Sequence, residues 1–338
     1  MKRDSVMGTL VMGRLALSLL FVLLACTGAA QSLTVVELNC ENLFDCRHDS
    51  LKQDTEWLPD GIRRWTPQRY WRKLNHIGQE LISCYADSLN KQLPDLIALV
   101  EVENDSVVFD LTHRSLLRGA GYEYVMTESP DVRGIDVALL YQPFSFRPLR
   151  HYPLRVAPLP GMRPTRDILY VAGEVITGDT LHVFVLHAPS KYGGERATRP
   201  FRRVIAERLI AAVDSLRSSV PDARIIVAGD FNDEADAPAM QRYEADSLVN
   251  ITRQARGING TRGTYCYRGR WHSIDHILVS PSLLPFVERA FINDAPFLLT
   301  DDERYRGRKP LRTYNGLRYQ RGYSDHLPLV VRLRLLPR

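Results

Sequence analysis

The chain has 338 residues, of which 45% are apolar and 25% are charged, which are ordinary values for a globular protein. The sequence contains no repeat of 20–50 residues and no low-complexity stretch, which excludes solenoid and fibrous architectures. A formal net charge of +5 at pH 7 is too small to indicate a nucleic-acid binder by itself.

The first thirty residues differ from the rest of the chain. Basic residues precede an apolar run from Leu15 to Ala25, and small residues follow it. This order is typical of a secretory signal peptide, and the apolar run is short for a membrane span. We therefore predict a signal peptide over residues 1–30, cleavage after Ala30, and export to the periplasm or beyond the cell.

The cysteines leave two questions open. Leu-Leu-Ala-Cys26 resembles a lipoprotein box, although Leu24 fits its middle position poorly, so plain export is preferred to a lipid anchor on Cys26. The mature chain keeps four cysteines, and their spacing matches no zinc pattern. They are expected to be buried thiols or to form one or two disulfides: Cys40, Cys46, Cys84 and Cys266.

The N-terminal third of the mature chain alternates strands with helices. Residues 33–39 are rich in β-branched side chains and predict a strand, and the polar residues 45–65 predict a surface loop. Thr66 and Pro67 are typical of a helix start, and apolar residues continue at helical spacing to about residue 91. Residues 96–100 form a continuous apolar run, which predicts a buried strand that ends at Glu101.

The remaining elements complete an α/β pattern. Helices are expected near 105–118, 196–219 and 238–248, and strands near 122–127, 135–141, 167–176, 181–187, 224–228, 274–280 and 327–334. No Pro/Gly/Ser-rich linker divides the mature chain. We therefore expect one domain over residues 31–338, built as a four-layer α-β-β-α sandwich in which two mixed sheets pack face to face with helices outside.

Acidic and amide residues recur where apolar strands end. They are Asn39, Glu41, Glu101, Asp230, Asn232, Asp275 and Asp325, and His326 directly follows the last of them. Strand ends at the rim of an α/β sheet are where binding sites are built. Oxygen ligands without a cysteine or paired-histidine cage favour Mg²⁺, with Mn²⁺ or Ca²⁺ possible, over zinc. The pattern predicts a metal site for phosphate chemistry.

Six segments together resemble one known superfamily. LNCENLF, DLIALVEVEN, HAPS, AGDFND, SIDHILVS and YSDHLP occur in the order typical of the endonuclease/exonuclease/phosphatase superfamily. The resemblance spans roughly residues 33–334 and is greatest to its exported bacteroidete-type members. It implies a deoxyribonuclease I-like fold and hydrolysis of phosphoesters.

The resemblance also implies roles for individual residues. Asn39 and Glu101 would hold the metal, Glu41 would help directly or through water, and Asp325 would lie near the metal or its waters. Asp230 would orient or deprotonate the attacking water, and Asn232 would bond the phosphate. Asp275 would orient His326, and His187 would contact the scissile phosphate. Asp136 lies in the segment where related enzymes place a carboxylate behind that second histidine, and a turn role for it is equally open.

Basic residues supply candidates for substrate binding. Residues 304–321 contain six arginines and one lysine interleaved with tyrosines, and this run leads directly into Ser324-Asp325-His326. Arginine suits phosphate and tyrosine stacks on bases, so we expect part of this run to bind substrate, with Arg312 the best candidate. Lys191 is a further candidate, with a solvated loop lysine as its alternative. Arg69 and Lys73 are expected to be solvent-exposed.

These features predict an exported, metal-dependent phosphodiester hydrolase that uses direct water attack. A nuclease acting on nucleic acid is the first choice, and a phosphatase or phospholipase C-like enzyme acting on inositol phosphates or sphingomyelin is the alternative. An inactive nucleic-acid-binding module is less consistent with the sequence, because Glu101 and His326 are both present. We expect a monomer without an obligate protein partner.

Overall fold

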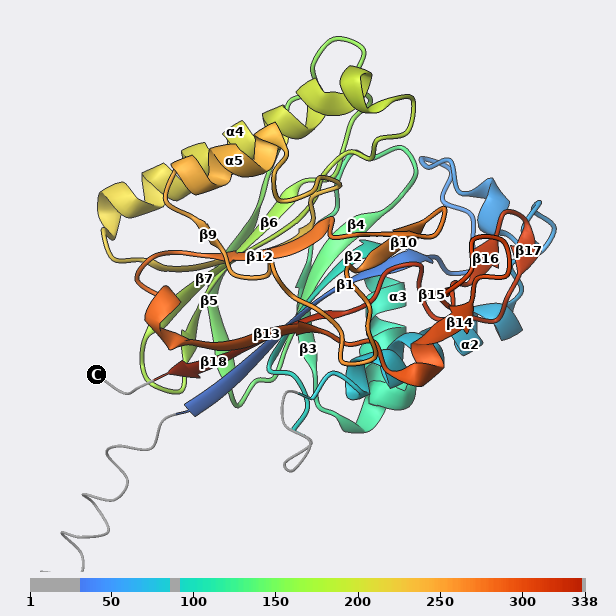
Figure 1. Ribbon diagram of the computed structural model, residues 1–338, viewed down its shortest axis with the longest axis horizontal. Helices are drawn as coiled ribbons and strands as arrows, with labels where there is room; N and C mark the ends of the chain where they lie inside the picture. The colour runs from blue at the N-terminus through green and yellow to red at the C-terminus, as the bar shows by residue number, and fades with distance from the viewer. Residues whose placement is uncertain (1–30, 86–91, 336–338) are drawn as a thin grey trace, which may run out of the picture.

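The computed structural model describes residues 31–85 and 92–335, so the predicted leader and Cys26 lie outside the described residues. Two six-stranded sheets form the centre of the molecule (Figure 1). The first sheet, in spatial order, consists of β13 (Val287–Ile292), β18 (Leu329–Leu335), β1 (Gln31–Leu43), β2 (Leu96–Val102), β4 (Asp136–Tyr141) and β3 (Glu123–Met126). The second consists of β5 (Phe146–Leu154), β6 (Ile168–Val175), β7 (Thr180–His187), β8 (Arg224–Asp230), β12 (Asp275–Val279) and β9 (Val249–Asn250).

Short hairpins and helices surround the sheets. The hairpins pair β10 (Tyr265–Tyr267) with β11 (Arg270–His272), β14 (Leu299–Asp301) with β15 (Arg308–Pro310), and β16 (Tyr314–Asn315) with β17 (Arg318–Tyr319). The α-helices are α2 (Pro67–Ile82), α3 (Asp105–Phe109), α4 (Glu195–Ser219) and α5 (Pro238–Ala245). Single turns of 3₁₀- or π-helix cover Thr55–Trp57, Asp110–Arg114, Leu116–Gly119, Leu284–Phe286 and Pro296–Leu298.

Three layers of buried apolar side chains hold the sheets and helices together. Residues such as Val35, Val100 and Val183 point from both sheets into a shared core between them. The opposite face of the first sheet packs against α2, and the opposite face of the second packs against α4 and α5. Figure 1 shows α4 and α5 together along one side of the molecule. The predicted four-layer sandwich is confirmed.

The predicted strands occur close to their expected positions, but the sequence pattern missed three edge strands. β5, β9 and β13 lie at the outer edges of their sheets. β5 carries Pro148 and Pro153 and is mostly exposed, so it lacks the apolar alternation that marks a half-buried strand.

The predicted helix over 105–118 is interrupted. The Asn104 side chain accepts a hydrogen bond from Val107 N and caps α3, but the α-helix ends at Phe109. The hydroxyl of Thr112 donates to the Val108 carbonyl, and Ser115 begins a separate 3₁₀ turn. Hydroxyl groups that bond backbone carbonyls in this way favour a change of helix type.

Lys73 was predicted to be exposed, and that prediction is wrong. Its side chain is 1% exposed and lies between α2 and the segment before β18. The ammonium group donates to Thr313 Oγ1 at 2.7 Å and to the Tyr323 carbonyl, and it lies 3.8 Å from Glu41 Oε2. A lysine buries its charge only where partners replace water, and these groups provide them.

The described cysteines are all free thiols, with Cys40 and Cys84 buried and Cys46 and Cys266 partly exposed. Of the two alternatives left open by the sequence, the structure shows unpaired thiols. No helix in residues 31–85 or 92–335 is both long enough and apolar enough to cross a membrane.

Candidate active site

The second sheet brings three of the predicted site residues to one edge. His187 is the last residue of β7, Asp230 is the last residue of β8, and the two strands run parallel with these residues in register. Asp275 begins β12, which is antiparallel to β8 and pairs Asp275 with Asp230. His187 and Asp230 follow buried apolar stretches and Asp275 precedes one, so the strands themselves fix where these side chains emerge.

The first sheet supplies the facing residues. Asn39 in β1 pairs with Val100 in β2, which places the next residue, Glu101, beside it. The Asn39 side-chain amide donates to Asp230 Oδ2 at 3.2 Å and so joins the two sheets directly. His326 precedes β18, the other neighbour of β1. The structure therefore brings together residues that are far apart in the sequence. Asn39 and Asp230, for example, are 191 positions apart.

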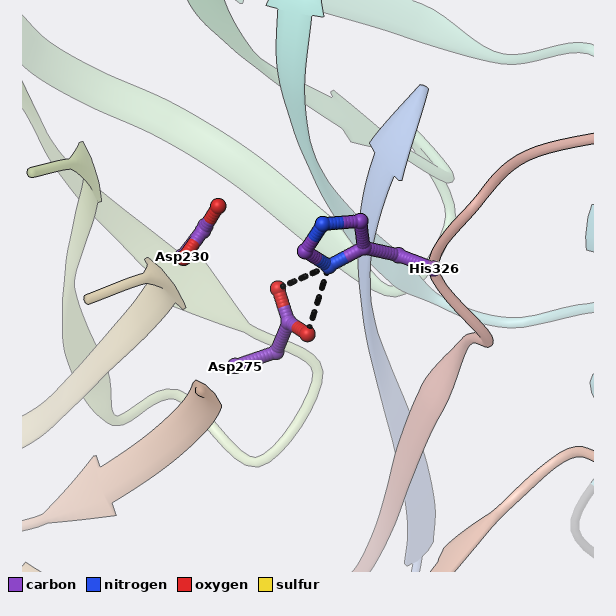
Figure 2. A group of neighbouring side chains, drawn as sticks. All are labelled: Asp230, Asp275 and His326. Atoms are coloured by element: carbon purple, nitrogen blue, oxygen red, sulfur yellow. Dashed lines mark hydrogen bonds and ion pairs between the residues drawn. The ribbon is translucent and has the colours of Figure 1, made fainter. Parts of the chain in front are cut away.

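His326 and Asp275 form a buried pair (Figure 2). His326 Nδ1 lies 3.0 Å from Oδ1 and 2.8 Å from Oδ2 of the carboxylate, and the Thr264 hydroxyl also donates to Asp275. A carboxylate at Nδ1 keeps the proton on that nitrogen and leaves Nε2 to act in the site. Ser324 Oγ accepts from His326 N at 3.2 Å and donates to the Asn39 carbonyl at 2.6 Å.

The surrounding charges set the protonation of His326. Burial lowers the pKa of this imidazole, but the carboxylates of Asp275, Asp325 and Asp230 outweigh burial and hold the pKa well above 6.5. The ring is therefore an imidazolium at neutral pH in the metal-free protein. Tyr265 covers one side of it, with the two ring centroids 4.9 Å apart.

Asp230 lies beside this pair and is 2% exposed. Its Oδ1 accepts from Asn232 N at 2.7 Å, and Asn232 Nδ2 donates to the Ala188 carbonyl at 3.0 Å. Asn232 has a φ of +52°, which turns the chain back so that its amide reaches the site edge. Burial and the Asp275 charge raise the pKa of the Asp230 carboxyl to about 8.

His187 approaches Asp230 from the other side. Its Nε2 lies 3.7 Å from Asp230 Oδ2 and 3.8 Å from Glu101 Oε1. Burial, with the positive charge of Arg166, lowers the pKa of this ring well below 6.5, so His187 is neutral at pH 7.

Asp136 was one candidate for a carboxylate that hydrogen-bonds His187 from behind, and the structure does not show this contact. Nδ1 of that ring is buried and has no hydrogen-bond partner among the described residues. Asp136 instead accepts from the Thr127 hydroxyl at 2.5 Å and from Ser129 N at 3.1 Å. Its neighbours are local turn residues, which is the alternative that the sequence left equally open.

Glu101 retains an oxygen that could meet a cation. Its Oε2 accepts from Asn42 N at 2.8 Å, whereas Oε1 points toward His187. The chain turns sharply here, since Asn42 and Glu101 both have positive φ, at 55° and 61°. Non-glycine residues adopt this conformation at a cost, and such strain is typical of functional sites. A carboxylate oxygen beside the Asn39 amide fits the oxygen chemistry that Mg²⁺ prefers.

A second group could also ligate a cation. Asp230, Asp275 and His326 each offer one atom, and those atoms lie within 4.8 Å of one another. However, Asp275 already bonds His326 and Thr264, and both bonds would have to loosen around an ion. The structure therefore favours an acid–base role for these three residues and leaves the Glu101 side as the better metal position.

Glu41 and Asp325 both accept hydrogen bonds from Arg312. The Glu41 carboxylate accepts from Thr313 N at 2.5 Å and from Arg312 Nε at 3.2 Å, besides its ion pair with Lys73. These contacts occupy both oxygens, so Glu41 anchors the segment before β16, and a direct metal contact would break them. Asp325 Oδ2 accepts from Arg312 Nη2 at 2.7 Å.

The predicted substrate-binding cations are partly neutralised. Arg312 bridges Glu41 and Asp325, and its side chain is 37% exposed at the edge of the site. Lys191 Nζ lies 3.4 Å from Asp233 Oδ1 and 3.9 Å from Glu195 Oε1. Each of the two residues would therefore meet an anion only together with its acidic partners.

The sequence analysis missed Glu37. It lies in β1 on the face that points between the sheets, is fully buried, and has no hydrogen-bond partner for either oxygen among the described residues. Burial, with the charges of Asp275 and Asp230, raises its pKa well above 4.5, so it is held as a neutral acid beneath the site. The one acidic residue within the apolar run 33–38 was the signal that could have indicated it.

A four-layer sandwich with histidines and acids at one end of its facing sheets defines a class of phosphoester-hydrolysing α/β enzymes. The sequence profile of the Endonuclease/Exonuclease/phosphatase family matches residues 34–335, and the chain belongs to that family. No curated protein matches the chain in sequence.

Solved structures share the fold at low sequence identity. A family member from Bacteroides thetaiotaomicron is 17% identical with a TM-score of 0.58, covering 90% of this chain and 98% of its own. A mannosyl-6-phosphatase from the same organism is 19% identical with a TM-score of 0.57, over 88% and 98% of the two chains. The human Nocturnin catalytic domain is 19% identical with a TM-score of 0.53, over 91% and 97%.

Proposed function

We propose that this protein is an exported, divalent-metal-dependent phosphoester hydrolase in which water attacks phosphorus directly. The observation that carries the proposal is the placement of the Asp230 carboxyl between a charged His326 and a neutral His187. Phosphoester hydrolysis needs a proton acceptor for water and positive charge for the phosphoryl oxygens, and these groups supply both in one buried cluster.

Asp230 is the best candidate for the base. Burial raises the pKa of this carboxyl to about 8 in the metal-free protein, so it is mostly protonated at pH 7. A bound cation would favour the ionised form, which is the form that acts as a general base. Hydrogen bonds from Asn39 and Asn232 orient the carboxyl group. A water placed on it would lose its proton as the new phosphorus–oxygen bond forms.

The two histidines have different parts. The His326 imidazolium, held by Asp275, donates from Nε2 to an oxygen that gains charge in the transition state. His187 is neutral and can donate one hydrogen bond to phosphate without carrying charge. Removal of either donor would slow the reaction without abolishing substrate binding.

Glu101 and Asn39 would hold Mg²⁺, with Mn²⁺ or Ca²⁺ as alternatives. When bound, the ion supplies Lewis-acid polarisation of the phosphoryl group. The oxygen of Glu101 that accepts no hydrogen bond from the described residues supports this assignment. Asp325, which accepts from Arg312, is proposed to lie near the waters of the ion.

Two substrate classes remain candidates. A nuclease role rests on the basic stretch 304–321. A small-molecule phosphatase role is supported by a cavity of about 620 Å³ beside Arg312 and Asp325. The similarity in fold to a mannosyl-6-phosphatase is consistent with the second class. Export rests on the leader pattern in residues 1–30, and action as a monomer completes the proposal.

One panel of assays tests the proposal. The purified protein is incubated with Mg²⁺, Mn²⁺ or Ca²⁺ and with plasmid DNA, RNA, sugar phosphates, inositol phosphates or sphingomyelin. We expect metal-dependent release of a phosphoester product, with large losses in His326→Ala and Glu101→Gln. Equal activity of wild type and both variants would refute the mechanism.

A further inference from the structure

A cavity of about 620 Å³ lies directly beside the catalytic cluster. Its walls come from the β10–β11 turn, the β14–β15 hairpin and the β16–β17 hairpin, and Arg312 and Asp325 lie at the side nearest the site. Asp325 immediately precedes His326, and Tyr265 of β10 forms a backbone bridge with His326. The cavity is therefore a continuation of the site, of a size that small-molecule pockets have.

The walls are held by specific contacts. Lys309 pairs with Asp302 at 3.2 Å, and Asp302 N donates to the Gly307 carbonyl at 2.8 Å. At the β10–β11 turn, a Cβ added to Gly269 would lie 2.6 Å from Tyr305 Cβ, so this turn packs closely against the β14–β15 hairpin. Three segments that are separate in the sequence thus form one rim.

The cavity is lined by cations that have no acidic partner. Among the residues that the structure describes, Arg268, Arg304 and Arg318 have no carboxylate within ion-pair distance, unlike Lys309 and Arg312. The Arg268 guanidinium lies 5.1 Å from the ring centroid of Tyr267, and that of Arg304 lies 5.4 Å from the ring centroid of Tyr305. Guanidinium groups supported in this way suit phosphate, which they can bind with two parallel hydrogen bonds.

Acids without a cationic partner lie among these arginines. In the described part of the chain Asp301 and Glu303 pair with no lysine or arginine, and both line the cavity. An ionised carboxylate only accepts hydrogen bonds, so it suits hydroxyl groups. The same carboxylates would repel the continuous negative charge of a nucleic-acid strand. The lining thus matches a molecule that carries hydroxyls and a localised anion.

We propose that this cavity is the specificity pocket of the enzyme and holds the non-scissile half of a small polyhydroxylated phosphoester with a second phosphate, of the hexose bisphosphate type. Arg268, Arg304 and Arg318 bind the second phosphate, Asp301 and Glu303 accept from hydroxyls, and the exposed rings of Tyr267 and Tyr305 border the carbon skeleton. This inference rests on the proposed phosphoester hydrolysis and names its substrate class.

The test compares matched substrates. The purified protein with Mg²⁺ is assayed on glucose 1,6-bisphosphate and fructose 1,6-bisphosphate, on the corresponding monophosphates, and on bis(p-nitrophenyl) phosphate as a substrate without hydroxyls or a second phosphate. We expect kcat/KM for at least one bisphosphate to exceed that of its monophosphate by about tenfold or more, the effect of one charged hydrogen-bonding group. No preference in any pair would overturn the inference.

Variants assign the preference to the cavity. A triple Arg268→Ala, Arg304→Ala, Arg318→Ala variant should lose the bisphosphate preference and keep its activity on bis(p-nitrophenyl) phosphate. Arg306→Ala is the control. Arg306 is an exposed arginine that lies in the same hairpin as Arg304, between β14 and β15, but it does not line the cavity. A preference that survives the triple variant, or an oligonucleotide that is cleaved better than every bisphosphate, would overturn the inference.

The hydroxyl contacts have their own test. Asp301→Asn with Glu303→Gln should lower kcat/KM for the hexose bisphosphate and leave that of butane-1,4-diol bisphosphate, which lacks free hydroxyls, unchanged. Equal effects on both would refute the hydroxyl role. Absence of hydrolysis of every substrate, bis(p-nitrophenyl) phosphate included, would instead refute the proposed function itself.

Discussion

His187 and His326 approach Asp230 from different sheets and differ in protonation state. His187 ends β7 in the second sheet and is kept neutral by burial and by Arg166. His326 precedes β18 in the first sheet and is kept charged, against the effect of burial, by Asp275 and its acidic neighbours. One site thus contains a neutral and a charged imidazole on either side of one carboxyl group.

The charge of His326 depends on Asp275, so Asp275→Asn should lower its pKa. The substitution removes the Asp275 carboxylate, which stabilises the imidazolium. Burial, which favours the neutral ring, is unchanged. The measurement is the pH titration of the His326 ring signals by NMR in the metal-free protein. A titration midpoint in the variant equal to or higher than that of wild type would contradict the assignment.

His326→Gln should reduce kcat by roughly 10²–10⁴-fold, the usual contribution of a positioned acid or base. Glutamine keeps a hydrogen-bond donor of similar size but carries no charge. His151→Gln is a matched control, because His151 is an exposed histidine of β5. The mechanism fails if the two variants are equally active under saturating substrate and metal.

Glu101→Gln should raise the Mg²⁺ concentration for half-maximal activity by at least about tenfold. The amide keeps the size of the side chain but loses the charge that attracts a divalent cation. Mg²⁺ titrations of activity, and of binding by calorimetry, measure the change. Glu103→Gln is the control, because the Glu103 carboxylate accepts a hydrogen bond from Asp45 N. The Mg²⁺ concentration for half-maximal activity should be unchanged in this variant. Unaltered Mg²⁺ binding in Glu101→Gln would assign the metal elsewhere.

Lys73→Met should destabilise the protein by about 3 kcal/mol, because it leaves the Glu41 carboxylate buried without its ammonium partner. Urea unfolding at neutral pH measures this loss. The double variant with Glu41→Gln should lose less than the sum of the two single variants, since neither charge then remains unpaired. Additive losses would show that the two side chains do not interact across their 3.8 Å separation.

Glu80 should make stability fall as pH rises. It is fully buried, neither oxygen has a hydrogen-bond partner among the described residues, and burial raises its pKa from 4.5 to about 8. The folded state keeps the proton that the unfolded chain releases above pH 4.5, so this residue costs stability up to about 1.4 kcal/mol per pH unit between those values.

Glu80→Gln removes this proton linkage. The difference in unfolding free energy between the variant and wild type should therefore shift in favour of the variant from pH 5 to pH 8. Urea unfolding at both pH values measures it, with the exposed Glu128→Gln as control. A pH-independent difference would mean that Glu80 is ionised in the folded protein.

The sequence by itself predicted the sandwich and most residues of the candidate site. His187 and the individual roles came from the resemblance to the superfamily, whereas the acids at strand ends follow from a local pattern. A run of buried apolar residues must end where the sheet ends, so a polar residue directly after it emerges at the rim. Asp230 after residues 224–229 and Glu101 after residues 96–100 are examples. The distance between these two residues depends on how the two sheets pack, because Glu101 belongs to β2 of the first sheet and Asp230 to β8 of the second.

Only the tertiary structure decided which charges are paired. Lys73 looks like a solvated helix residue until Thr313 and Tyr323, 240 and 250 positions away, cover it. In the sequence Glu41 resembles a metal ligand, but in the structure its carboxylate accepts a hydrogen bond from Thr313 N. The edge strand β5 was also not predicted, because it is mostly exposed and carries two prolines and therefore lacks the apolar alternation of a half-buried strand. Pairing between distant segments depends on packing, and packing leaves no local signal in the sequence.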